Sequence, residues 1–262
     1  MSVTSGELKH RESANMPSDD SSTVGGAKTA SDVGSSIGAV FHTVTANPDE
    51  GDSTIYQYKK TFGVNTNADT DLTSAKIWLK NALDDVAANG VISATSTSAD
   101  DDTDYKIKVV GEDAGALVIT EEITLNGTTE VNGSSTFSKV FWVELRDVSS
   151  GNLVVSNGDI SIEVNGTEVG TIPLGYNCAL AIVDIGLVAT LDDSGTATNA
   201  LTAPGGISFT RPRTFAGGLD VANSGSLSFG SGQGIWWRLT VEGGLIPAPE
   251  LTITFGLKGS TT

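Results

Sequence analysis

Asn157-Gly158 and Asn165-Gly166 enclose the alternating run Ile160-Ser161-Ile162-Glu163-Val164, and this stretch decides the fold class. Asn and Gly reach positive φ at little cost, which the two central residues of a tight hairpin turn require. Alternation of apolar and polar residues is typical of a strand with one buried face. The same dipeptide also occurs earlier in the chain, at Asn89-Gly90, Asn126-Gly127 and Asn132-Gly133. The middle of the chain is therefore predicted to consist of antiparallel β-hairpins.

Candidate strands continue on both sides of this stretch. Within 89–185 they are spaced by about ten residues, which is typical of a β-sandwich. They are predicted at 105–110, 117–125, 137–145, 152–155, 160–164, 168–173 and 179–185. Further strands are predicted at 54–62, up to about Leu79, and between 206 and 257. The chain is therefore expected to be all-β, and its 262 residues allow two domains.

The charge of the chain excludes some classes of partner. It has 32 acidic and 15 basic residues, and a formal net charge of -17. Proteins that bind nucleic acids neutralise phosphates with Lys and Arg, and anionic membrane surfaces attract the same side chains. We therefore expect neither a nucleic acid nor a membrane as partner. No apolar run is long enough to cross a bilayer and the polar N-terminus is unlike a secretory signal, so synthesis in a cytoplasm is expected.

Groups that carry covalent chemistry are scarce. The single cysteine, Cys178, lies in an apolar run and is predicted to be a buried thiol. Of the two histidines, only His42 is a plausible general base, and no serine and acid accompany it in a recognisable pattern. An enzyme is therefore not expected, and neither catalytic nor cofactor-binding residues are predicted.

The acidic cluster Asp100-Asp101-Asp102 with Asp104 resembles a calcium loop only superficially. An EF-hand loop counted from Asp100 would need Gly at its sixth position and Glu at its twelfth. The chain has Tyr105 and Gly111 there. A solvated acidic turn is predicted instead, with no metal site.

Residues 1–36 have almost no large apolar side chains and are rich in Ser, Gly, Asp and Ala. Such a segment cannot by itself bury enough surface to offset the entropy of ordering it. We therefore predict an extended polar arm that is held by neighbouring molecules in an assembly.

Tryptophan and arginine in two strands are candidate contact residues. In the strand predicted at 235–241, Trp236 and Arg238 share one face. One interpretation is a core face and a surface face; the alternative is that Trp236 and Arg238 anchor a partner, because these residue types dominate interface hot spots. Trp78 is the third candidate for partner binding. Exposed Trp78, Trp142 or Trp236 would also suit a carbohydrate platform.

Several motifs stand towards the two ends of the chain. Near the start they are Thr23-Val24-Gly25-Gly26-Ala27, Glu50-Gly51-Asp52-Ser53-Thr54-Ile55-Tyr56 and Leu72-Thr73-Ser74-Ala75-Lys76-Ile77-Trp78-Leu79. Near the end they are Ala203-Pro204-Gly205-Gly206-Ile207-Ser208-Phe209, Gly234-Ile235-Trp236-Trp237-Arg238-Leu239-Thr240-Val241 and Leu251-Thr252-Ile253-Thr254-Phe255-Gly256-Leu257-Lys258-Gly259. These motifs resemble the opening and the end of a family of tailed-bacteriophage virion structural proteins. Between them, Glu121-Glu122-Ile123-Thr124-Leu125-Asn126-Gly127-Thr128-Thr129-Glu130-Val131 is similar to a strand and turn of other small phage virion proteins.

The resemblance implies a division into domains. Residues 37–88 and 186–262 would form a discontinuous base β-sandwich, into which a second β-sandwich, residues 89–185, is inserted. Insertions succeed at exposed loops whose two ends lie close together. The expected fold is thus two antiparallel β-sandwich domains, one inserted into the other, behind an extended N-terminal arm.

The resemblance also implies a role in the virion. The expected function is that of a capsid decoration or cement protein that binds the assembled shell, with the major capsid protein or another virion protein as partner. A homo-oligomer, such as a trimer, is expected by analogy. A neck, tail or fibre component and a carbohydrate-binding or adhesive module remain the alternatives, and the sequence does not separate these positions.

Overall fold

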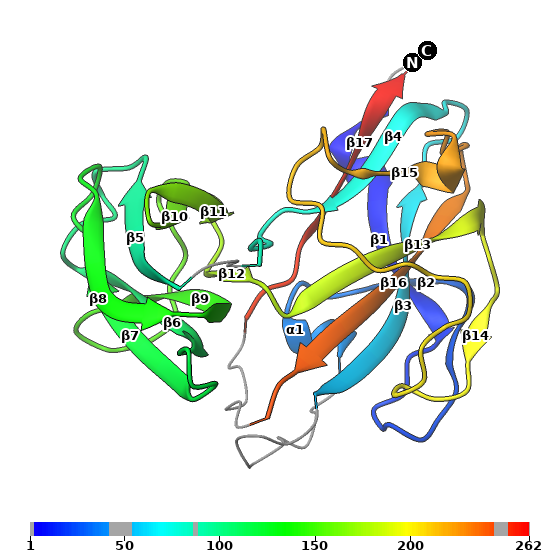
Figure 1. Cartoon of the computed structure of the whole chain (residues 1–262). Coiled ribbons are helices and arrows are strands. Elements are labelled where there is room, and N and C mark those ends of the chain that lie inside the picture. Colours follow the sequence, from blue (N-terminus) through cyan, green and yellow to red (C-terminus); the bar gives the residue numbers. More distant parts are fainter. Residues whose placement is uncertain (1–2, 42–53, 86–88, 244–250, 262) are drawn as a thin grey trace.

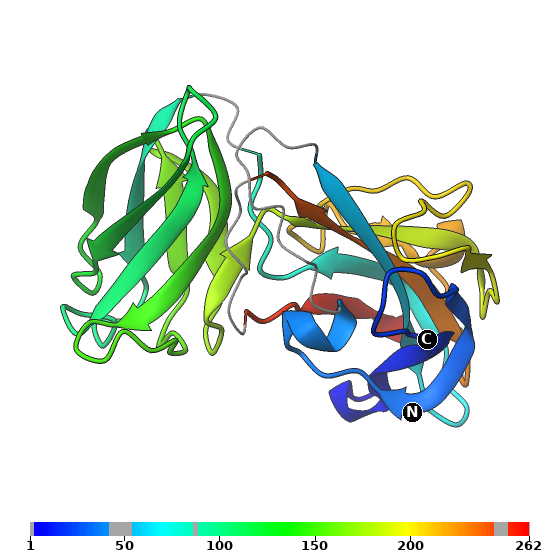
Figure 2. The same ribbon diagram turned by 90° about the horizontal axis from the view of Figure 1, so that it is seen from below.

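The computed structural model describes residues 3–41, 54–85, 89–243 and 251–261, and nearly all its regular structure is β. Two lobes of antiparallel sheets lie side by side (Figures 1 and 2). The prediction of an all-β fold of two sandwiches is confirmed. The strands of one lobe are consecutive in the sequence, whereas those of the other come from both ends of the chain.

The inserted domain is a sandwich of two four-stranded sheets. One sheet has the order β11-β10-β5-β8 and the other the order β12-β9-β6-β7. The strands are β5 (Gly90–Ser96), β6 (Tyr105–Glu112), β7 (Val118–Thr124), β8 (Val131–Phe137), β9 (Lys139–Asp147), β10 (Ile160–Val164), β11 (Thr167–Ile172) and β12 (Cys178–Leu180). Alternate side chains of both sheets form one apolar core, which includes Ile107, Phe137 and Ile162. This is the arrangement expected for a stretch of alternating strands.

The Asn-Gly pairs have different roles in this domain. Asn165 and Gly166 both have positive φ, 51° and 76°, and form the tight turn between β10 and β11. The predicted hairpin is confirmed there. Asn132-Gly133, in contrast, lies inside β8, and Asn89-Gly90 leads into β5, so these two pairs are not hairpin turns. A dipeptide that permits a turn does not impose one when the strand pairing continues through it.

The base domain combines a six-stranded sheet with a three-stranded sheet. Their orders are β13-β16-β3-β1-β2-β14 and β15-β4-β17. The strands are β1 (Leu8–Asn15), β2 (Val24–Asp32), β3 (Ile55–Asn65), β4 (Leu72–Leu79), β13 (Val183–Leu191), β14 (Thr196–Ala197), β15 (Leu219–Asp220), β16 (Gly232–Val241) and β17 (Phe255–Thr261); the helices are η1 (Ser5–Glu7), α1 (Ile37–Val40) and η2 (Val221–Asn223). Ile77 of β4, Ile185 of β13 and Trp237 of β16 belong to the core between the two sheets. Since β13 begins at Val183, the chain returns to the base slightly before residue 186.

The described part of the N-terminal segment, residues 3–36, belongs to the base domain. β1 pairs with β3 from Leu8 opposite Asn65 to Glu12 opposite Thr61, and β2 pairs with β1. The segment is extended, as predicted, but the separate arm held by neighbouring molecules is a wrong prediction. Its polar residues become ordered because β3 supplies a ladder of backbone hydrogen bonds that the segment lacks alone. The arm therefore gives no support to an assembly.

Candidate partner-binding groove and the domain junction

Trp236 is a core residue. Its side chain is 2% exposed and packs with Tyr58, Val188 and Ala200 on the second face of the six-stranded sheet. The prediction of Trp236 as an exposed anchor is therefore wrong. The alternating side chains of β16 do point to two faces of the sheet, as predicted. The face that was expected to meet solvent is covered by residues 197–209, so that both faces are buried around Trp236.

Arg238 lies on the same face as Trp236, at the rim of this layer. Its guanidinium donates to the Asp184 carboxylate at 2.8 Å and lies 5.1 Å from the ring centroid of Phe209. The ring of Tyr56, a residue that is 40% exposed, also contacts this guanidinium, with its centroid 5.3 Å from the guanidinium carbon. Arg238 is thus committed to contacts within its own domain, and the structure does not bring it together with Trp78.

Trp78 is the one candidate on an outer face. It is half-buried on β4, and its ring packs against Phe215 with the centroids 5.5 Å apart. The space below the ring exists because residue 256 is glycine: a Cβ there would lie 2.3 Å from the indole. Lys258 lies over Phe215, with its Nζ 5.3 Å from the ring centroid. Trp78, Phe215 and Lys258 therefore form a continuous aromatic and cationic surface.

This surface borders a groove of about 890 Å³. The groove follows β17 and separates it from the N-terminal segment that leads into β1. Leu8, Val33 and Leu257 supply apolar walls, and Trp78 stands at its outer side. Its volume is within the range of roughly 300–1,000 Å³ that is usual for ligand sites. The groove is therefore a candidate site for binding a partner.

The groove is cationic although the chain is acidic. Lys9, Lys80 and Lys258 are among the described residues that line it, and no aspartate or glutamate is. The whole chain carries a net charge of -17. A negatively charged or apolar partner therefore suits this surface better than a basic one.

His10 lies at the inner side of the groove. Its ring is 4.6 Å from that of Phe255, edge to face, and its Nε2 is 2.8 Å from Thr61 Oγ1. Burial lowers the pKa of His10 to about 4, because the charged imidazolium would lose its hydration, and the nearby Asp32 opposes this only in part. His10 is therefore neutral near pH 7 and acts as a packing residue.

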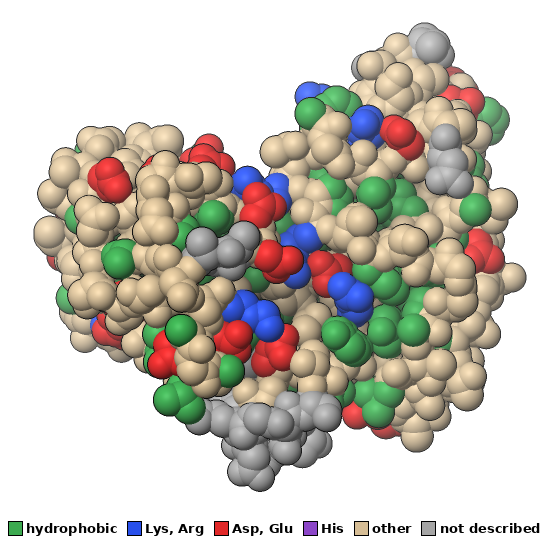
Figure 3. Space-filling model, in the orientation of Figure 1, with side chains coloured by type: hydrophobic (Ala, Val, Ile, Leu, Met, Phe, Trp, Pro, Cys, Tyr) green, Lys and Arg blue, Asp and Glu red, His purple; other side chains and the backbone are tan. Residues whose placement is uncertain are grey.

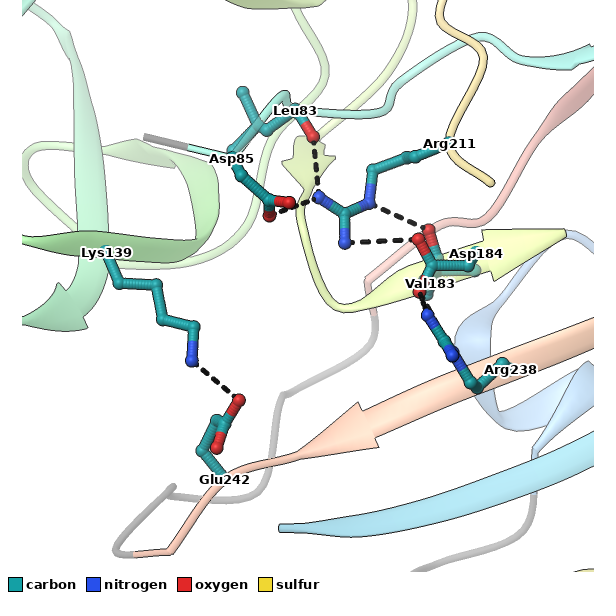
Figure 4. Close-up of polar contacts among 8 residues, drawn as sticks. All are labelled: Leu83, Asp85, Lys139, Val183, Asp184, Arg211, Arg238 and Glu242. Carbon is teal, nitrogen blue, oxygen red and sulfur yellow. Dashed lines mark hydrogen bonds and ion pairs between the residues drawn. The ribbon is translucent and has the colours of Figure 1, made fainter. Parts of the chain in front are cut away.

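A second polar cluster holds the two domains together. Arg211 donates to the Leu83 carbonyl at 3.1 Å, on the segment that enters the insert, and to the Val183 carbonyl at 3.3 Å, on the segment that leaves it. The same guanidinium pairs with Asp85 at 2.9 Å and with Asp184 at 3.2 Å (Figure 4). One side chain thus clamps both connections between the domains.

More contacts cross the junction. Arg213 pairs with Asp84 at 2.8 Å and with Glu168 of the insert at 3.4 Å, and Lys139 of the insert pairs with Glu242 of the base at 2.7 Å. Basic and acidic side chains alternate in the hollow between the lobes (Figure 3). The sequence analysis did not identify Arg211-Pro212-Arg213 as a functional motif. Two arginines on either side of a proline, in a chain that is otherwise acidic, are the signal that could have indicated this junction cluster.

The junction is also apolar. Phe141, Trp142 and Leu180 of the insert belong to the same buried cluster as the core of the base. Trp142 is 3% exposed. Neither Trp142 nor Trp236 can therefore serve in a carbohydrate platform, and only Trp78 of the three candidates remains accessible.

The groups considered for chemistry are placed as follows. Cys178 is buried, as predicted, and burial raises its pKa to about 11, so the reactive thiolate is disfavoured. His42 lies outside the described residues. Within the parts that the structure describes, no group of three or more His, Cys, Asp or Glu side chains is arranged to hold a metal ion. No helix of this part is long and apolar enough to cross a membrane.

One aspartate of the acidic turn at residues 100–104 is buried, although the whole turn was predicted to be solvated. Asp100, Asp102 and Asp104 are exposed, but Asp101 is fully buried. Its carboxylate accepts hydrogen bonds from Ser96 Oγ at 2.6 Å and from the backbone N–H of Gly158 at 3.0 Å. Asp101 is a structural residue that ties together turns of the insert.

No family model matches the chain, and neither a curated protein nor a solved structure is significantly similar to it.

Proposed function

We propose that this chain is a structural protein of a virion, which attaches to the assembled shell through its base domain and presents the inserted domain outward. The observation that carries the proposal is the clamped insertion. Two connections lead into the insert, and Arg211 binds the backbone of both. A domain attached in this way is held in one orientation relative to its base.

The apolar part of the junction supports the same interpretation. Loose pairs of domains usually have small, polar interfaces, whereas a buried hydrophobic contact opposes relative motion. Here Trp142 and Phe141 continue the core of the base. A fixed, projecting sandwich suits a protein that displays or reinforces, and the resemblance noted in the sequence favours a tailed phage as the setting.

The charge supports binding to a pre-assembled partner over self-association. A net charge of -17 keeps free copies apart and soluble. A protein that binds only the assembled shell stabilises that state by mass action, without altering the free subunits. The major capsid protein is the proposed partner; a homo-oligomer, such as a trimer, would then form on the particle.

The test is to mix the purified chain with particles that lack it and to sediment them. We expect saturable binding, and a difference map from electron microscopy should show two-lobed density on the shell, with the insert outermost. Density only at the neck, tail or fibre would favour that alternative position. Failure to bind any particle would contradict a virion role.

A further inference from the structure

Along one edge of β17, backbone groups have no hydrogen-bond partner among the described residues. β17 is an end strand of its sheet, and among the described strands it pairs only with β4. Leu79 of β4 donates its N–H away from β17, to the Pro212 carbonyl at 2.8 Å, so the pair of Leu79 with Phe255 is a non-hydrogen-bonded one. By alternation the same holds for Leu257 opposite Ile77. The N–H and C=O groups of Phe255 and Leu257 therefore point to the free edge.

The two sides of this edge differ in chemistry. On the inner side the groove is apolar, with Leu8, Val33 and Leu257. On the outer side stand Trp78 and the exposed side chain of Lys258. A strand added here would direct alternate side chains to the two sides, because successive residues of a strand point to opposite faces. It would therefore need apolar residues at every second position.

The charge defines the other positions. Lys80 and Lys258 are exposed and line the groove, which has no carboxylate among its described residues. Lys76, which lies on the same face of β4 and opposite Lys258, is already paired with Asp220 of β15 at 3.6 Å. Glutamate or aspartate at the alternate positions of the added strand would complement Lys80 and Lys258.

We propose that β17 binds one extended segment of a shell protein as an added strand, with apolar residues in the groove and carboxylates beside Lys80 and Lys258. Such strand addition obtains affinity from backbone hydrogen bonds and specificity from side-chain positions. The identity of the partner rests on the proposed function. A second copy of this chain is a poorer occupant, since it would bring two bodies of net charge -17 together.

The backbone part of the proposal is tested with a pair of variants at one position. Leu257→Ala removes the side chain and keeps the N–H, whereas Leu257→Pro also removes the N–H that faces the free edge. Proline at such a site leaves the ladder with β4 intact. We expect Leu257→Pro to bind stripped particles at least about tenfold more weakly than Leu257→Ala, at similar melting temperatures. Equal binding by the two variants would overturn strand addition.

The charge part is tested with Lys80→Glu/Lys258→Glu, and Lys106→Glu on the insert is the control with the same kind of change. The double variant should lose at least about tenfold in affinity, and the control should not. A peptide of alternating Glu and Val, titrated against the Trp fluorescence of the chain, should bind better than one of alternating Lys and Val. Equal affinity for the two peptides, or unchanged particle binding by the double variant, would contradict the proposal.

The outcomes separate this inference from the proposed function. If the wild type binds particles and the edge variants bind equally well, the groove inference fails and the virion role stands. If the wild type binds no particle but discriminates between the peptides, the virion role fails and strand addition stands with another partner. A wild-type dimer in sedimentation that Leu257→Pro converts to monomer would make a second copy the occupant and overturn the choice of partner.

Discussion

The two sandwiches differ in how their strands are collected. The insert uses one uninterrupted segment, from β5 to β12, and it contains two hairpins of consecutive strands, β6–β7 and β10–β11. The base assembles its large sheet around β3, which lies between β1 from the N-terminal segment and β16 from near the C-terminus. Local turns thus specify these two hairpins of the insert, whereas pairing between the two ends of the chain specifies the base. The two domains should respond differently to changes at the chain ends.

The largest expected effect is that of deleting residues 1–36. β1 is an interior strand of the base sheet, and its loss would leave β3 without one of its two neighbours and remove β2 with it. We expect the base to lose its cooperative unfolding while the insert keeps its own. Calorimetry of the truncated chain, compared with an isolated fragment 89–182, would measure this. Two undisturbed transitions would show that the N-terminal segment is dispensable.

Trp236→Ala should have the next largest effect. Removing a buried Trp leaves a cavity, and the expected cost is about 3–5 kcal/mol of unfolding free energy, confined to the base. Trp78→Ala is the matched control; because Trp78 is half-buried, we expect a cost of about 1 kcal/mol. Urea unfolding of both variants measures the difference. A neutral Trp236→Ala would restore the interpretation of this residue as a surface anchor.

Asp101→Ala is the corresponding test within the insert. The substitution would leave the Gly158 N–H and the Ser96 hydroxyl buried without their acceptor, and each such loss costs about 1–3 kcal/mol. The expected total is about 2–6 kcal/mol, in the insert alone. Exposed Asp102→Ala is the control and should change little. If Asp101→Ala lowered the unfolding transition of the base as much as that of the insert, the assignment of Asp101 to the stability of the insert alone would be contradicted.

The sequence predicts the insert better than the base for a physical reason. The turn at Asn165-Gly166 is fixed by the conformations that these two residues permit, and nothing distant is needed. The burial of Asp101 was missed because its donors at Ser96 and Gly158 meet only in the folded sandwich. Local pattern thus identifies strands such as β6, β9 and β10 and the β10–β11 turn, but it missed β5 and β8, and 152–155 is not a strand. Polar groups shared between turns stay hidden as well.

In the base, composition misled the prediction for the N-terminal segment. Gly25 has φ of 99°, and a Cβ there would lie 2.7 Å from the Gly195 carbonyl and 3.1 Å from Trp236. Gly25, one of the small residues that suggested a separate extended arm, is therefore required by close packing. The groove was not predictable either, because the free edge of β17 and the apolar wall at Leu8 come from opposite ends of the chain. Only Trp78 was identified in advance.

A pH titration sharpens the comparison further. His10 has a pKa of about 4 when folded and an ordinary value near 6.5 when unfolded, so the unfolded chain binds more protons between these values. Neutral, buried His10 makes its full contribution to the stability of the base above about pH 6.5. This contribution declines as the pH falls and is lost by about pH 4. At pH 5 the base should have lost roughly 2 kcal/mol.

The insert should lack this dependence, because neither histidine of the chain lies within residues 89–185. His10→Phe is expected to remove the decline of the base between pH 6.5 and 5, as followed by thermal melting. A His10→Phe variant with the wild-type slope would assign the acid sensitivity to other groups.

The smallest expected effect concerns the coupling of the two domains. Lys139 and Glu242 form a 2.7 Å ion pair across the junction, but their side chains are 40% and 19% exposed, so screening keeps its contribution below about 1 kcal/mol. Glu242→Gln should bring the two unfolding transitions slightly apart at low salt and leave them unchanged at high salt. Glu122→Gln, which breaks the 2.8 Å pair with Lys106 inside the insert, is the control and should shift only the insert transition. Separation of the transitions by several degrees at high salt would mean that Glu242 stabilises the junction through something other than this charge pair, with its 2.6 Å hydrogen bond from Thr54 Oγ1 as the first candidate.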